Sequence, residues 1–319
     1  MIKKIWFWLS VSRLFSLPMT ILSWLVIFVY SLVLYGGNIL NGILALIGIS
    51  FAHLATNLAD DYFDYKQMLK DGNMMSTVVK NKCIYIKDGT VTLNDVLKVV
   101  IIYCLIAFSV GVILFFRSGV DVLWLAVIGG ILTLSYSWFS RVGLSELAVG
   151  IAFGPLFFEG VFYVMCGYFS WNVFILSIAV GAFTVGVLYV HTVLDFDSDM
   201  VLHKKTLCCR IGDKNCAVYV LYFLYALGFL SIIFFAVTTL YFNILTGLLA
   251  LPFAINVCNA LKNYNKDKDF LPKIKWWHYP LDDFEKRKED NTASFYFVLY
   301  QSRNLILWVC VLIILGIFI

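Results

Sequence analysis

Long apolar stretches alternate with shorter polar segments along almost the whole chain. A helix that crosses a bilayer needs about 20 mostly apolar residues, and nine stretches approach or exceed that length. They occupy residues 17–36, 39–58, 94–116, 120–138, 145–168, 171–193, 215–240, 242–261 and 300–319. The pattern therefore predicts an all-α integral membrane protein with nine transmembrane helices, arranged as a single membrane domain over residues 1–319.

The segments that join the predicted spans differ in length. Three links are very short, whereas 59–93, 194–214 and 262–299 are long and polar and are expected to be loops. Residues 1–16 contain lysines and aromatic side chains, which favours an amphipathic lead-in lying in the membrane interface. A signal peptide is the alternative, but Arg13 interrupts the apolar stretch and no small-residue cleavage site follows it.

The composition supports a membrane protein and excludes a soluble enzyme. Hydrophobic residues make up 61% of the chain and charged residues only 14%, whereas soluble domains carry about 25% charged residues. So much apolar surface requires lipid as its solvent. We therefore expect membrane lipid as a partner and no nucleic acid.

Lysines and arginines fall almost entirely on one side of the predicted bundle. If the N-terminus and the loops 59–93, 139–144, 194–214 and 262–299 share one side, that side carries 23 of the 24 Lys and Arg residues, all except Arg117. The positive-inside rule makes this side cytoplasmic. We expect a protein of the cell (inner, cytoplasmic) membrane, with the N-terminus and the long loops inside and the C-terminus outside.

Two acidic clusters lie where the second and sixth spans meet these cytoplasmic loops. The first reads Asn57-Leu-Ala-Asp60-Asp61-Tyr-Phe-Asp64, and the second reads Asp195-Phe-Asp197-Ser-Asp199. Residues four apart share one face of a helix, so each cluster presents at least two carboxylates to one point. Crowded carboxylates keep their charges cheaply only when a cation lies between them. Solvated loop acids are the alternative, but two clusters at equivalent helix ends favour a binding site.

A divalent cation that carries a phosphate fits these clusters and the basic residues that follow them. Carboxylate oxygens select Mg²⁺ or Mn²⁺, and Mg²⁺ is commonly held by one or two carboxylates together with substrate phosphates. Lys204 and Lys205 follow the second cluster, and they would supply positive charge to phosphate oxygens. The predicted metal ligands are Asp60, Asp61, Asp64, Asp195 and Asp199.

Taken in order, these motifs resemble those of the UbiA-type intramembrane prenyltransferases, and most closely the branch that prenylates 1,4-dihydroxy-2-naphthoate in menaquinone synthesis. Residues 57–64 resemble that branch's N-L-A-N-D-Y-G-D, and residues 195–207 resemble its D-x3-D-x4-K-R-T-L. Between them, Tyr136-Ser137, Gly143-Leu-Ser-Glu146 and Gly154-Pro155 match its Y-[ST], G-x-x-E and G-P series. The resemblance covers roughly residues 15–260, and the ordered set is specific although each motif alone is weak.

The resemblance implies a fold, a reaction and a set of functional residues. It implies a helix bundle around a central cavity that opens at the cytoplasmic side. There, Mg²⁺ would bind a polyprenyl diphosphate, whose prenyl group alkylates an aromatic acceptor such as a quinone precursor. It implies catalytic roles for Asp61, Asp64, Asp195 and Asp199. Contacts to the diphosphate or the prenyl chain would come from Asn57, Tyr136, Arg141, Lys204 and Lys205.

The chain departs from the family pattern close to the acidic clusters. Asp60 replaces an Asn, Met68 stands where many members carry another Asp, and His203 replaces a Gly. An Arg that the family carries in the first long loop is absent. The lysines near its place are Lys80, Lys82 and Lys87.

Three other functions remain open from the sequence. The acceptor could be a different aromatic ring, such as 4-hydroxybenzoate or homogentisate. Carboxylates in an apolar chain are also typical of cation-coupled transporters, although those proteins usually place them near the bilayer midplane. A homologue that binds prenyl diphosphate without catalysing transfer is the third alternative.

Further positions carry structural expectations. Potential metal ligands recur at every fourth residue from His191 to His203, and a single helix through them would form a transition-metal stripe. Glu146 is expected to hydrogen-bond within the bundle. Gly154 should allow close helix packing, and Pro155 should kink the fifth span.

Overall fold

The structure is a computed structural model that describes residues 2–72 and 83–319 of the chain. Within these residues the regular elements are helices, and no strand occurs. In this described part of the chain, eight helical segments are long and apolar enough to cross a membrane, and a bent pair of shorter helices makes a ninth span. The first five spans are α2 (Leu17–Tyr35), α3 (Ile39–Asp71), α5 (Leu93–Ser118), α6 (Asp121–Leu134) with α7 (Tyr136–Val142), and α8 (Ser145–Ile151) with η4 (Ala152–Leu156) and α9 (Phe157–Cys166).

The remaining spans are α10 (Trp171–Leu194), α13 (Lys214–Thr239), η5 (Phe242–Ala250) with α14 (Leu251–Lys266), and α16 (Ala293–Phe318). The short elements are α1 (Ile2–Val11), η1 (Leu14–Ser16), α4 (Ile84–Lys87), α11 (Phe196–Val201), α12 (Leu207–Ile211), η6 (Trp276–His278) and α15 (Phe284–Glu289). The predicted all-α membrane class is confirmed, and the nine predicted spans are found when the bent pair counts as one.

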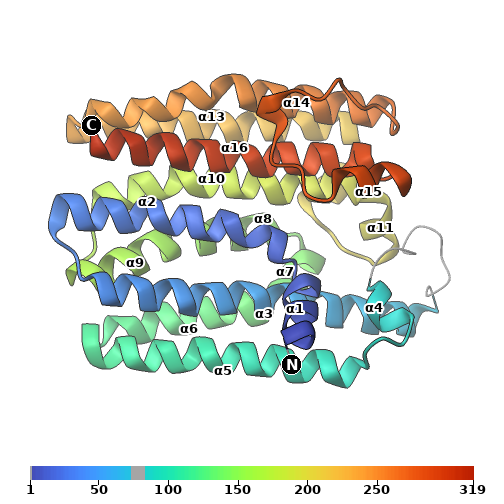
Figure 1. Ribbon diagram of the computed structural model, residues 1–319, viewed down its shortest axis with the longest axis horizontal. Helices are drawn as coiled ribbons and strands as arrows, with labels where there is room; N and C mark the ends of the chain where they lie inside the picture. The colour runs from blue at the N-terminus through green and yellow to red at the C-terminus, as the bar shows by residue number, and fades with distance from the viewer. Residues whose placement is uncertain (1, 73–82) are drawn as a thin grey trace.

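The long helices run side by side along one axis of the molecule (Figure 1). Elements α4, α7, α11 and α15 gather at one end of this bundle, and the C-terminus lies at the opposite end. We call the first of these the acidic end, because α3 terminates there and α11 carries the second acidic motif. The arrangement places both motifs on the same side of the predicted membrane.

Two spans differ from their predicted form at places that matter for the site. Helix α3 does not end at residue 58 but continues to Asp71, so the predicted loop 59–93 begins as regular helix. The fourth span bends by 61° between α6 and α7. The bend falls next to Tyr136, and it turns α7 across the acidic end of the bundle.

The fifth span carries the predicted kink. A π-helical turn over Ala152–Leu156 contains Pro155, and Gly154 has non-helical backbone angles. A β-carbon at Gly154 would lie 3.3 Å from the carbonyl oxygen of Ser177 on α10. Glycine therefore allows the close approach of these two spans, and both expectations for this segment are confirmed.

Candidate functional site

Helix α3 holds the first acidic motif on one of its faces. Asp60 and Asp64, one turn apart, are only 5% and 3% exposed. Asn57 lies one turn nearer the membrane centre, and its side-chain amide donates to the carbonyl of Ser12 at 3.0 Å. In this structure, Asn57 therefore fastens the N-terminal segment to α3, and its predicted contact with substrate stays a prediction.

Lys204 joins the two acidic motifs. Its side chain is 7% exposed, and its Nζ lies 2.9 Å from Asp64 Oδ2 and 3.4 Å from each carboxylate oxygen of Asp60. Its backbone N–H donates to the carbonyl of Asp199 at 2.9 Å. The second motif thus positions the backbone of Lys204, and the carboxylates of the first motif pair with its ammonium group.

The electrostatics around Lys204 are those of a buried ion cluster. Burial by itself would lower the pKa of this lysine, but the carboxylates of Asp60, Asp64 and Asp199 raise its pKa well above that of a free lysine. Because the ammonium stays charged at neutral pH, it can exchange one anionic partner for another. Binding a diphosphate requires such an exchange.

A second cation, Arg13, reaches the first motif from the connection between α1 and α2. Its Nη2 lies 2.8 Å from Asp61 Oδ1 and 3.7 Å from Asp60 Oδ2. The hydroxyl of Tyr85 on α4 donates to Asp61 Oδ2 at 2.9 Å. Burial lowers the pKa of Arg13, but Asp61 and Asp60 raise it, and the net shift is upward. Asp61 is therefore held by two elements that precede and follow its own helix.

The bend before α7 brings further groups to the first motif. The hydroxyl of Ser137 donates to Asp60 Oδ1 at 3.2 Å. Its neighbour Tyr136 lies close to the charged groups of Asp60, Lys204 and Arg13. The structure therefore brings Tyr136, one of the predicted substrate contacts, to the carboxylates of the first motif.

Two other predicted phosphate contacts lie at the edge of the site. Arg141 Nη2 donates to the carbonyl of Phe63 at 3.2 Å. The side chain of Lys205 is exposed, while its backbone N–H donates to the carbonyl of Ser140 at 2.9 Å. A β-carbon at Gly143 would lie 2.5 Å from the Lys205 carbonyl oxygen, so glycine permits this approach. The substrate roles of both cations stay predictions.

The second acidic motif lies across an interruption between two helices. Helix α10 ends just before Asp195 and α11 begins just after it. Asp195 Oδ2 is 3.8 Å from His191 Nε2, and Asp199 is buried on α11. Because the helix is interrupted, the single helix that a metal-binding stripe from His191 to His203 would need does not form. In residues 2–72 and 83–319, no three His, Cys, Asp or Glu side chains are placed to hold a metal ion.

His203 occupies a backbone position that suits glycine. Its φ is +55°, in the left-handed region that favours glycine. Its imidazole Nε2 lies 3.6 Å from a carboxylate oxygen of Asp71, at the end of α3. This contact joins the end of α3 to the segment that follows α11. The left-handed backbone agrees with the glycine that the family pattern has at this position.

Asp197 faces away from the other acids of its motif. Its carboxylate contacts Lys214 Nζ at 3.0 Å and Lys268 Nζ at 3.2 Å, and its side chain is 51% exposed. Lys268 belongs to the predicted loop 262–299, so this surface ion cluster fixes that loop to α11. The omission of Asp197 from the predicted site agrees with its position.

Glu146 fastens the segment that carries Lys204. Its Oε1 accepts the backbone N–H of Leu207 at 3.1 Å, and its Oε2 accepts the hydroxyl of Ser145 at 2.8 Å. The hydroxyl of Thr206 caps α12 by accepting from the N–H of Cys209. The prediction that Glu146 bonds within the bundle is confirmed.

Three residues of the cluster escaped the sequence reasoning. Arg13 had a signal, since a charge that interrupts an apolar lead-in needs a partner. Ser137 belongs to the Y-[ST] match beside Tyr136, although no role was assigned to it, whereas Tyr85 had no signal because tyrosines in polar loops are common. Of the lysines near the missing family arginine, Lys87 lies on α4, while Lys80 and Lys82 lie outside the described residues.

The donor set of the site fits Mg²⁺ in its chemistry. Hard carboxylate oxygens from α3 and from the joint between α10 and α11 lie at the same end of the bundle, and Mg²⁺ is commonly held by one or two carboxylates together with substrate phosphates. Lys204 pairs with Asp60 and Asp64, and Arg13 pairs with Asp61. Both cations are also suited to bind the oxygens of a diphosphate.

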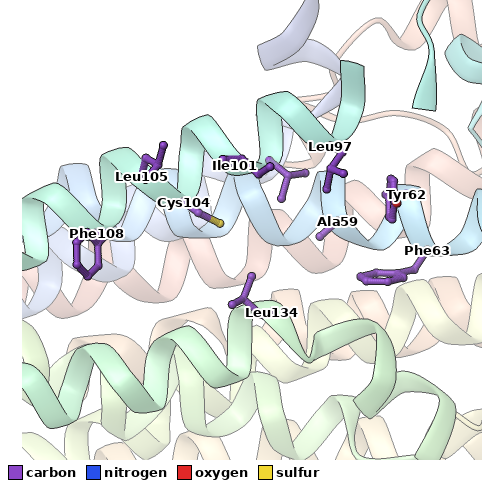
Figure 2. A pocket seen from close by; sticks show the side chains of 10 residues that line it. Ala59, Tyr62, Phe63, Leu97, Ile101, Cys104, Leu105, Phe108 and Leu134 are labelled. Carbon is purple, nitrogen blue, oxygen red and sulfur yellow. The ribbon is translucent and has the colours of Figure 1, made fainter. Parts of the chain in front are cut away.

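A separate apolar cleft of about 460 Å³ lies between α3, α5 and the end of α6 (Figure 2). On α3 it is lined by Ala59, Tyr62 and Phe63. At 100° per residue, Tyr62 lies about 200° around the helix from Asp60, so the cleft and the carboxylates occupy opposite faces. Exposed apolar walls such as Ile101 and Leu134 suit contact with lipid chains, and the predicted central cavity stays a prediction.

Comparison with known proteins points to one family. The model of the UbiA prenyltransferase family matches residues 22–279. A 1,4-dihydroxy-2-naphthoate octaprenyltransferase of Mycobacterium leprae is 25% identical over 159 residues, which cover 48% of this chain and 53% of the relative. The chain thus spans about half the length of this curated relative.

Solved structures share the fold. The apo UbiA homologue from Aeropyrum pernix K1 has a TM-score of 0.57 at 16% identity, covering 93% of this chain and 95% of that one. A UbiA homologue from Archaeoglobus fulgidus bound to GPP and Mg²⁺ has a TM-score of 0.52 at 10% identity, covering 93% and 99%. At these identities the likeness shows the fold alone. The family model, however, covers more than half of the chain, so this protein belongs to the UbiA prenyltransferase family.

Proposed function

We propose that this protein transfers a polyprenyl group from a polyprenyl diphosphate to 1,4-dihydroxy-2-naphthoate or a closely similar quinone precursor, with Mg²⁺ as cofactor. The observation that carries the proposal is the buried Lys204, which lies among carboxylates of both acidic motifs. The charge pattern of the loops favours the cytoplasmic side for this site.

Within this proposal, each charged group has a place. Lys204 and Arg13 bind the oxygens of the diphosphate, and Tyr136 lies beside them. The ligands of the metal come from Asp61, Asp64, Asp195 and Asp199. Bound Mg²⁺ would act as a Lewis acid that stabilises the negative charge of the leaving diphosphate.

The reaction breaks one bond and forms another. The bond between the first prenyl carbon and the diphosphate oxygen breaks, and its electron pair leaves with the diphosphate. A ring carbon of the acceptor forms the new carbon–carbon bond, and the ring then loses a proton, or CO₂ where the attacking carbon bears a carboxylate. Cationic side chains favour this step because they stabilise charge that grows as the diphosphate departs.

One turn deeper on the same face of α3, His53 meets aromatic side chains of the fifth span. His53 precedes Asn57 by one turn, and its ring contacts that of Phe153 with centroids 5.3 Å apart. Phe153 in turn stacks on Phe157 at 6.0 Å. Such walls exclude water from an allylic cation, and aromatic faces stabilise positive charge. They support an apolar path for the prenyl chain below the diphosphate.

The naphthoate acceptor is supported by the motif series and by the name of the mycobacterial relative. Transport is the less favoured function, because the carboxylates lie at one end of the bundle and are paired with cations. Coupling acids of transporters usually lie near the bilayer midplane.

The test is turnover by purified protein. Polyprenyl diphosphate and Mg²⁺ are supplied with three acceptors in parallel: 1,4-dihydroxy-2-naphthoate, 4-hydroxybenzoate and homogentisate. We expect prenylated naphthoquinol as the main product, and no product in EDTA. Product from only one of the other acceptors would overturn the naphthoate assignment. Tight diphosphate binding without any product would support the non-catalytic alternative, and cation flux across vesicles would support transport.

A further inference from the structure

Asp60 differs from the other acids of the first motif in what it touches. Its two carboxylate oxygens each lie 3.4 Å from Lys204 Nζ. Oδ1 also accepts the hydroxyl of Ser137, and Oδ2 lies 3.7 Å from Arg13 Nη2. Donors from three different segments of the chain therefore contact this carboxylate. The family pattern has a neutral asparagine at the same position.

A second departure from the family pattern lies about two turns further along α3. Met68 stands where many family members carry an Asp, and it is fully buried. It belongs to an apolar cluster with Trp8, Cys83 and Leu202. A carboxylate at position 68 would be buried in apolar surroundings, which costs free energy unless it is paired. The chain thus keeps an acid near Lys204 while using position 68 for packing.

We propose that Asp60 is the resident counter-charge of Lys204 and not a ligand of Mg²⁺. It holds the buried ammonium between the two acidic motifs when no diphosphate is bound. The diphosphate then takes the lysine from Asp60, so Asp60 weakens the binding of both the prenyl substrate and the released pyrophosphate. This inference rests on the proposed function, because it assigns a residue to the diphosphate site.

The experiment measures binding of inorganic pyrophosphate to the purified full chain by calorimetry, once in EDTA and once in Mg²⁺. In EDTA we expect Asp60→Asn to bind pyrophosphate about tenfold more tightly than the wild type, since one negative charge beside the lysine is gone. The gain in affinity on adding Mg²⁺ should stay as in the wild type. Asp64→Asn is the matched control, and it should lose most of that Mg²⁺-linked gain.

A thermal-stability cycle tests the pairing itself. Lys204→Met should destabilise the wild type strongly, because two buried carboxylates lose their cation. The same substitution should lower the melting temperature less in the Asp60→Asn background, because only the carboxylate of Asp64 then loses its ion pair with the ammonium group. Coupling between two contacting sites appears as this failure of additivity.

Two results would overturn the proposal. One is an Asp60→Asn variant that loses the Mg²⁺-linked gain as Asp64→Asn does, which would make Asp60 a metal ligand. The other is additivity of the two substitutions in the stability cycle. Neither measurement needs an acceptor, so failure of every acceptor in the turnover assay would sink the proposed function while these readouts still decide the role of Asp60.

Discussion

The two acidic motifs serve one site but are built differently. The first lies on the continuous helix α3, where spacing alone places Asp60 and Asp64 on one face. The second lies across the break between α10 and α11, followed by the left-handed turn at His203. The comparison shows that a regular helix can present several ligands by its spacing alone. Lys204 reaches the carboxylates on α3 because the helix that precedes it is interrupted at Asp195.

The largest effect should come from removing the group that joins the motifs. Lys204→Met removes the ammonium group that pairs with the buried carboxylates of Asp60 and Asp64, so we expect a loss of about 3–5 kcal/mol in stability. Turnover should fall about 100- to 1,000-fold, as when one donor to a developing negative charge is lost. Thermal unfolding and prenyl transfer measure the two effects. Lys205→Met, next in the chain but exposed, is the control and should lose far less of both.

Within the second motif, the buried Asp199 can be compared with the exposed Asp197. Asp199→Asn should raise the Mg²⁺ concentration for half-maximal activity about tenfold or more, as losses around a metal site commonly do. Asp197→Asn should leave it nearly unchanged, because exposed ion pairs contribute about 0–1 kcal/mol. A Mg²⁺ titration of both variants measures this. Equal shifts would contradict the separation of the two faces of α11.

On the first motif, the clamp around Asp61 should matter less than the lysine. Arg13→Gln removes a charged hydrogen bond worth about 1.5–3 kcal/mol, and Tyr85→Phe removes one of at most the same range. Both should lower the melting temperature, with Arg13→Gln also weakening pyrophosphate binding. If Tyr85→Phe weakened pyrophosphate binding as much as Arg13→Gln does, the assignment of Arg13 to the diphosphate would be wrong.

The smallest effect concerns the rim between the motifs. His203→Gly relieves a left-handed conformation that costs a side-chain-bearing residue about 1–2 kcal/mol, while it loses only an exposed contact with Asp71. We expect a slightly higher melting temperature. Asp71→Asn removes the same contact without the backbone gain, so it should be neutral or slightly lower. A clear loss of stability in His203→Gly would show that the contact outweighs the strain.

The sequence by itself determined the membrane class, the spans and the first motif, because hydropathy and helical spacing are local properties. It also placed Lys204 beside the acids through the motif order. The sequence also predicted correctly that Glu146 hydrogen-bonds within the bundle, because a carboxylate at the start of a span needs a nearby donor.

Only the tertiary structure decided how the charges are matched. Arg13 and Tyr85 reach Asp61 from segments 48 and 24 residues away in the chain, and no local pattern encodes such a pairing. The bend that brings Ser137 to Asp60 and the break at Asp195 also depend on packing between spans. A buried charge must find a partner, but which partner it finds is set by the three-dimensional arrangement of the bundle.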